Sequence, residues 1–116
     1  MMTDSYQKEK IYFRIIGLNA DLLPSFESSV KNHAVKTAKY KNTDLLVVSV
    51  ELAHDYNYYE LSRFLVSNKI SEQSYGIYIS LVTERDNDGV HLPDYALRFY
   101  KLVGGNIDFS FVCTRS

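Results

Sequence analysis

The stretch from Asp88 to Val112 constrains the fold of this 116-residue chain more than any other part of its sequence. Asp88-Gly89 is a turn signal that ends a strand, and Pro93 then takes a first-turn helical position, where its missing N–H costs nothing. Gly104-Gly105 ends that helix, because glycine enters the left-handed conformation without a steric penalty. The apolar positions of the helix and of the strand after it are Ala96, Phe99, Tyr100 and Val103, then Ile107, Phe109 and Phe111. The sequence therefore predicts a turn, a helix, a turn and a strand.

Hydrophobic periodicity predicts the remaining elements. The expected strands are 10–17, 43–52 and 75–83, and the expected helices are 21–32 and 57–68. The segment 34–40 fits either an edge strand protected by its lysines or an irregular loop. As a strand it completes the order βαββαβαβ. We therefore expect an α+β fold, with a single layer of about five mostly antiparallel or mixed strands and helices on one face.

Length and composition indicate one domain. We expect residues 1–9 to be a flexible leader and residues 10–116 to be a single α/β domain. Hydrophobic residues make up 46% of the chain and charged residues 23%, which argues against disorder and coiled coil. No apolar run approaches the roughly 20 residues that span a bilayer, and the start is not a secretion signal. We expect a cytoplasmic protein without membrane contact, and its one cysteine, Cys113, fits a reducing compartment as a buried thiol.

The strand pattern leaves one face of the sheet open. The residues expected on that face are Tyr12, Arg14, Ser49, Glu51, Tyr78, Ser80, Asp108 and Ser110. A solvated surface and a binding surface both fit this composition, because half-polar sheets occur with and without a ligand.

The charge of the chain bears on its partners. The net charge is −1, which gives no support to general nucleic-acid binding. Residues 1–50 carry seven Lys and Arg against five Asp and Glu, whereas residues 51–116 carry six against nine. Such an asymmetry steers charged partners without fixing the fold. We expect a protein partner and no nucleic acid.

Motifs for catalysis and for cofactor binding are absent from the sequence. There is no nucleophile elbow, Walker loop or dinucleotide fingerprint, and His33, His54 and His91 lie far apart. The loop 84–89 spaces its acidic residues as a calcium loop does, but Tyr95 stands where the bidentate glutamate is needed. We therefore expect no enzyme activity, no cofactor and no metal.

Tyrosine is unusually frequent, with 10 residues in a chain that has no tryptophan. Tyr56, Tyr58 and Tyr59 gather at the start of one predicted helix, beside Asp55 and Glu60. Exposed tyrosines among carboxylates suit docking onto a basic protein, since the ring buries much area at little entropic cost. Tyr58 also lies on the inward stripe of that helix, so core packing is the alternative reading of the cluster.

Parts of the chain resemble a bacterial domain-of-unknown-function family, number 4279. The segments that carry the resemblance are Phe13-Arg14-Ile15-Ile16-Gly17, Leu22-Leu23-Pro24, His91-Leu92-Pro93 through Leu97, Gly104-Gly105 and Ile107-Asp108-Phe109. The resemblance implies a small α+β domain whose last helix and last strand are joined by a glycine turn. It lends no catalytic residue to any position.

Small single-domain proteins of this kind also resemble the immunity proteins that bacteria keep against toxins delivered by competing cells. An immunity protein needs only a rigid surface that matches its toxin, so our first hypothesis is a non-enzymatic protein that occludes the active site of a cognate toxin. The residues expected to bind the partner are Tyr56, Tyr59, Glu60, Glu84, Asp86, Asp88 and Asp94. The alternative is a regulatory domain that senses a small molecule on the open sheet face or in a dimer groove.

Overall fold

One mixed sheet organises the part of the chain that the structure describes. This structure, a computed structural model, describes residues 7–83 and 93–113, with side chains at 10–80 and 93–109. Its elements are β1 (Gln7–Asn19), η1 (Ala20–Leu22), α1 (Leu23–Ser29), β2 (Val35–Lys39), β3 (Leu45–Glu51), α2 (Tyr59–Ser67), η2 (Glu72–Ser74), β4 (Tyr75–Thr83), α3 (Asp94–Val103) and β5 (Asn106–Cys113), where η marks a short 3-10 turn. The predicted order βαββαβαβ and the α+β class are confirmed.

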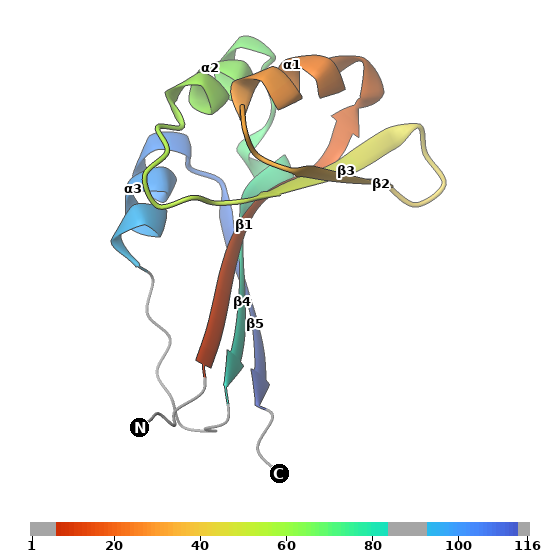
Figure 1. Cartoon of the computed structure of the whole chain (residues 1–116). Helices are drawn as coiled ribbons and strands as arrows, with labels where there is room; N and C mark the ends of the chain where they lie inside the picture. The colour runs from red at the N-terminus through yellow and green to blue at the C-terminus, as the bar shows by residue number, and fades with distance from the viewer. Residues whose placement is uncertain (1–6, 84–92, 114–116) are drawn as a thin grey trace.

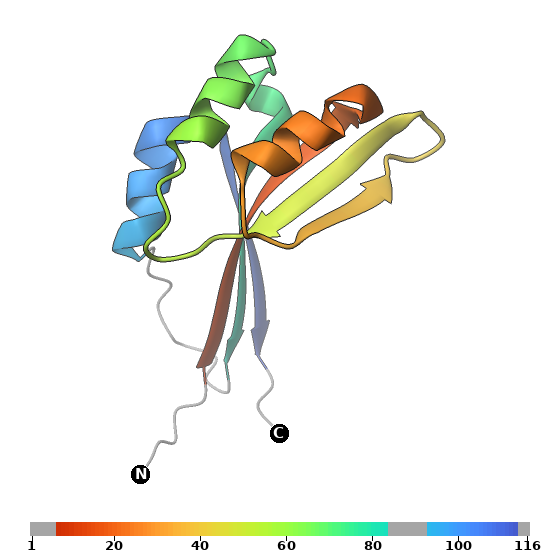
Figure 2. The same ribbon diagram turned by 45° about the horizontal axis from the view of Figure 1, so that its top comes forward.

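Strand β1 lies at the centre of the sheet, whose strand order is β2-β3-β1-β4-β5. Neighbouring strands are antiparallel except β4 and β5, which are parallel and have α3 between them in the chain. Helices α1, α2 and α3 cover one face of the sheet and leave the other open (Figures 1 and 2). The first part of β1 and the last parts of β4 and β5 run together beyond the helices (Figure 1).

The hydrophobic core lies between the sheet and the three helices. Alternate residues of β1 point into it, because successive side chains of a strand face opposite sides. Phe13, with 0% of its surface exposed, is the central ring. Its ring centre lies 6.4 Å from that of Phe26 in α1, 5.7 Å from that of Tyr75 in β4 and 5.4 Å from that of Phe99 in α3. One buried aromatic side chain therefore connects two helices to two strands.

Several boundaries differ from those expected from the sequence. The helix expected to reach Asn32 ends at Ser29, and Asn32 has a φ of 67°, which a right-handed helix cannot contain. Pro93 precedes α3 as its N-cap, with an extended ψ of 159°, and is not inside the first turn. Strand β1 begins at Gln7, within the segment expected to be a leader. The segment 34–40 contains the edge strand β2, so the strand alternative is confirmed.

The open sheet face carries the side chains that alternate with the core positions. The register places Tyr12 between Glu51 of β3 and Tyr78 of β4, and Tyr78 next to Asp108 of β5. Two residues further along β1, on the same face, Arg14 lies beside Ser49 of β3. The expected composition of this face is thus confirmed where side chains are described; the side chain of Ser110 lies outside the described set.

Candidate functional site

A groove of about 230 Å³ lies between α3 and the loop that joins β3 to α2. We call it the aromatic groove. Its principal side chains are His54, Tyr56, Tyr58, Tyr95, Arg98 and Phe99. Tyrosine and arginine, which supply four of these six side chains, are among the residue types most enriched at the energetically dominant positions of protein interfaces.

Tyr58 anchors the floor of the aromatic groove. Only 5% of its surface is exposed, and its ring centre lies 4.9 Å from that of Phe99 and 4.7 Å from that of Tyr56. The backbone N–H of Ala53 donates to its hydroxyl oxygen over 2.7 Å. The start of α2 is therefore tied both to the core and to the loop that forms one wall of the groove.

His33 completes this hydrogen-bond network from the loop between α1 and β2. Its Nδ1 lies 3.0 Å from the carbonyl oxygen of Lys31, which can only accept, so Nδ1 carries the proton. In the neutral ring Nε2 is then an acceptor, and the Tyr58 hydroxyl donates to it over 2.8 Å. The Tyr58 hydroxyl thus accepts one hydrogen bond and donates another.

Burial of Tyr58 raises the pKa of its phenol to about 12. The phenolate would lose its hydration in this site, and this loss is the largest cause of the shift. The hydrogen bond from Ala53 acts in the opposite direction, because it stabilises the negatively charged oxygen. The Tyr58 side chain therefore stays neutral throughout the physiological pH range.

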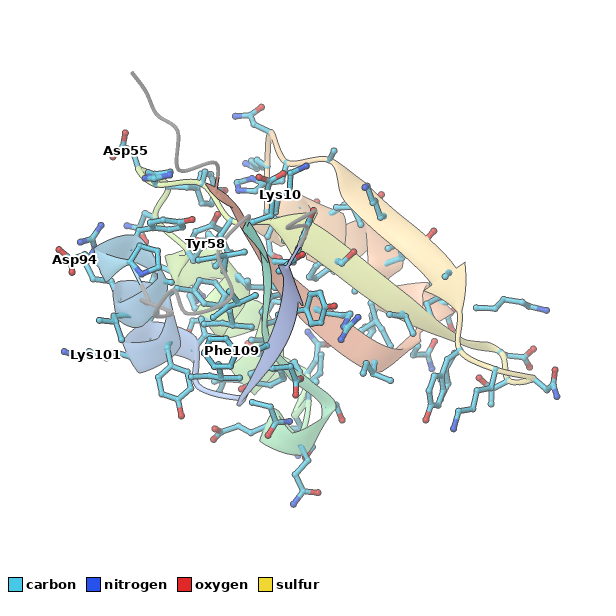
Figure 3. All side chains as sticks on the ribbon, turned by 90° about the horizontal axis from the view of Figure 1, so that it is seen from below. Lys10, Asp55, Tyr58, Asp94, Lys101 and Phe109 are labelled. Atoms are coloured by element: carbon cyan, nitrogen blue, oxygen red, sulfur yellow. The ribbon has the colours of Figure 1, made fainter. Side chains whose placement is uncertain are left out.

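A stacked ring pair lines the aromatic groove, and each ring is followed or preceded in the chain by an exposed aspartate. The rings of His54 and Tyr95 stack, with centres 4.1 Å apart and planes 29° apart. Asp55 follows His54 and Asp94 precedes Tyr95 in the chain, and both aspartates are exposed. Figure 3 shows these aspartates on the outer side of the molecule, with Tyr58 further in. A partner at this groove therefore meets flat rings and negative charge, with Arg98 as the positive group inside.

The residues that the sequence suggested for partner binding fall into separate places. Tyr56 lines the aromatic groove and Asp94 lies beside it. Tyr59, which is 55% exposed, and Glu60 instead lie next to Arg63 on α2. The Arg63 guanidinium is 3.9 Å from the Glu60 carboxylate, and its carbon is 5.9 Å from the centre of the Tyr59 ring. Glu84, Asp86 and Asp88 lie outside the described residues, as do His91 and the calcium-like loop.

No family model, curated protein or solved structure matches this chain. Within residues 7–83 and 93–113, no three His, Cys, Asp or Glu side chains gather as a metal site would need. Across the same residues, no helix has the length and apolar character needed to span a bilayer.

Sequence reasoning did not identify four side chains of this site. His33, His54, Tyr95 and Arg98 come from three separate segments of the chain. Their grouping depends on how the loop between β3 and α2 packs against α3, and no short motif encodes that packing. The nearest local signal was the cluster of three tyrosines at the start of α2, which correctly marked Tyr56 and Tyr58 as neighbours.

Proposed function

We propose that this protein is a non-enzymatic binding domain that neutralises a cognate bacterial toxin in the cytoplasm. The toxin would place a basic segment in the aromatic groove, and the bound domain would occlude the toxin's active site. The observation that carries the proposal is the convergence of Tyr56, Tyr95 and Arg98 on one groove of about 230 Å³, with the exposed Asp55 and Asp94 adjacent in the chain to residues that line it. The resemblance to family 4279 stays a prediction and assigns no role to these residues.

The rings of the aromatic groove suit a cationic side chain. A lysine or arginine that enters between Tyr56 and Tyr95 gains cation–π attraction, and exclusion of water strengthens that attraction. Asp55 and Asp94 then supply the opposite charge at the entrance. Arg98 offers guanidinium donors to a backbone carbonyl of the same segment. The groove can thus recognise both the charge and the main chain of a basic peptide segment.

Rigidity of the groove floor also supports binding by occlusion. The Tyr58 hydroxyl is held by Ala53 and His33, and its ring packs on Phe99 in the core. A surface that is ordered before binding loses little conformational freedom in the complex, which favours high affinity. An inhibitor of this kind needs no chemistry of its own.

The test begins with a tagged pull-down from the source cells at moderate salt and continues with the purified, stoichiometric partner. Titration of that partner's toxic activity should reach full inhibition at one equivalent of this protein. A partner that stays active in the complex would overturn the proposal of neutralisation.

Variants then test the groove by calorimetric titration of the same pair. We expect Tyr56→Ala to raise Kd at least about tenfold. Double charge reversal of Asp55 and Asp94 to lysine should raise Kd and slow association. Matched controls are Tyr100→Ala, an exposed tyrosine of α3 that does not line the groove, and charge reversal of the distant exposed Asp21 and Asp44. Equal affinities for groove variants and controls would exclude the groove as the binding site, with folding verified by circular dichroism.

A further inference from the structure

The open sheet face has a hollow of its own, on the side of the sheet away from the helices and the aromatic groove. Its volume is about 190 Å³, and it is lined by Tyr12, Arg14, Lys36, Ser49 and Tyr78. Two of these five side chains are cations and none is an acid. We call it the cationic hollow.

The sheet register arranges its polar side chains in one row. Ser49 of β3 pairs with Arg14 of β1 on one side and with Lys36 of β2 on the other. Adjacent strands lie about 4.8 Å apart, so the backbones that carry the two cations are roughly 10 Å apart, with the serine midway. A hydroxyl donor therefore lies between a guanidinium and an ammonium group on one face.

Stacking on Tyr78 positions Arg14 for a ligand. The guanidinium carbon is 4.5 Å from the centre of the Tyr78 ring. This cation–π contact uses the face of the guanidinium group and leaves N–H donors at its edge available. Gly76, the β4 residue that pairs with Arg14, has no side chain to cover the group. One face of the guanidinium is thus held by Tyr78, and its partner across the strand adds no cover.

Among the described side chains, no carboxylate forms an ion pair with Arg14 or Lys36, although Glu51 and Asp108 line the pockets on either side of the hollow. The ion pair found among the side chains at 10–80 and 93–109, with nitrogen and oxygen within 4.0 Å, joins Arg63 to Glu60 on α2 and not on this face. The carboxylates of the open face, Glu51 and Asp108, stand at the two ends of the neighbouring row, next to Tyr12 and Tyr78 respectively. Two cations roughly 10 Å apart repel each other only weakly in solvent, but an anion placed between them would be attracted by both.

We propose that the cationic hollow binds a small phosphate monoester. Arg14, Ser49 and Lys36 would donate to different oxygens of the tetrahedral group, and the rings of Tyr12 and Tyr78 would contact the carbon part. Three donors in a row suit three free phosphate oxygens better than the two oxygens of a planar carboxylate. The volume of about 190 Å³ is below the roughly 300 Å³ at which drug-sized sites begin, so the carbon part must be small.

The binding experiment is an NMR titration of the ¹⁵N-labelled full chain with inorganic phosphate, phenyl phosphate and benzoate. We expect saturable shifts at the amides of residues 14, 36 and 49 with both phosphates. Phenyl phosphate should bind more tightly because it also contacts the tyrosine rings, and benzoate should bind at least tenfold more weakly. The absence of saturation with either phosphate, or equal affinity for benzoate, would overturn the proposal.

A matched pair of variants separates a built site from general charge attraction. Lys36→Gln should raise the Kd for phenyl phosphate about tenfold, since a charge-assisted hydrogen bond is lost. Lys39→Gln removes the same charge from β2 but pairs with Leu46 on the other face of the sheet, and it should change Kd less than twofold. Both positions are exposed on an edge strand, so neither change threatens the fold. Equal weakening by both variants would refute a specific site.

Removal of a negative charge near the hollow tests the proposed position of the phosphate in a second, independent way. Glu51→Gln should tighten phosphate binding about twofold, because a carboxylate at the end of the neighbouring row repels the ligand. Weaker binding in this variant would contradict the proposed position of the phosphate. This site is separate from the aromatic groove, so phosphate binding can succeed or fail whether or not the domain neutralises a toxin.

Discussion

The hydroxyl oxygen of Tyr58 lies 2.8 Å from Nε2 of His33, and this contact joins the start of α2 to the loop between α1 and β2. The two residues are 25 positions apart in the chain. Because Ala53 donates to the same hydroxyl, three loops or element ends meet at one oxygen atom. The aromatic groove therefore depends on a buried polar group, and its stability should respond to changes in that group.

Removal of this hydroxyl should destabilise the fold. In Tyr58→Phe the backbone N–H of Ala53 and Nε2 of His33 lose their common partner, and we expect the free energy of unfolding to fall by about 1–3 kcal/mol. Urea unfolding followed by circular dichroism measures the change. Tyr59→Phe is the matched control, since Tyr59 is 55% exposed, and it should change stability by less than about 0.5 kcal/mol. Similar losses in both variants would argue against the network.

The raised pKa of Tyr58 predicts a loss of stability at high pH. The unfolded chain ionises this phenol near pH 10, whereas the folded protein keeps it neutral up to about 12. Unfolding therefore releases a proton in this window, and stability falls as pH rises, by up to about 1.4 kcal/mol per pH unit. Between pH 9 and pH 11 the free energy of unfolding should fall more steeply with pH for the wild type than for Tyr58→Phe. The other titrating groups are the same in both proteins, so the difference in slope reports Tyr58 alone. Parallel profiles would contradict this prediction.

The central ring of the core predicts a large effect from a single truncation. Phe13 is fully buried against Phe26, Tyr75 and Phe99, so Phe13→Ala should cost about 3–5 kcal/mol through lost burial and the cavity that remains. Phe109, on edge strand β5, is 56% exposed, and Phe109→Ala should cost less than about 1 kcal/mol. Thermal unfolding of both variants tests the contrast, and comparable losses would mean that Phe109 is buried in solution.

The fold could be predicted from the sequence largely because its burial is periodic. Strand β4 was placed correctly at 75–83, since Tyr75, Ile77 and Ile79 alternate strictly with residues of the open face. The segment of β2 was ambiguous, because an edge strand of four exposed residues and one half-buried residue shows little alternation. The end of α1 was overestimated because Val30, although buried, lies beyond the last helical residue and continues the apolar spacing.

The candidate site was much less predictable than the fold. Local pattern identified the tyrosines at the start of α2, and the structure places Tyr56 and Tyr58 together there. It could not reveal that His54 stacks on Tyr95, because that contact requires the β3–α2 loop to pack against α3. Helical spacing within the predicted helix 57–68 does place Arg63 beside both Tyr59 and Glu60, and the structure shows these contacts. Tyr59 and Glu60 therefore already have a partner within α2, whereas Tyr56 lines the groove.

A glycine of β4 gives the last prediction, which concerns the attachment of edge strand β5. A Cβ at position 76 would overlap the carbonyl oxygen of Asn106, so the parallel pairing of β4 with β5 requires glycine there. Gly76→Ala should destabilise the protein by at least about 2 kcal/mol, because backbone atoms have to move. Hydrogen exchange should show β5 amides losing protection before those of β1 and β3. Ser80→Ala, on the same face of the same strand, is the control and should leave β5 protected. Unchanged β5 exchange in Gly76→Ala would show that the backbone at Asn106 accommodates the added methyl group with the pairing intact, and would contradict the prediction.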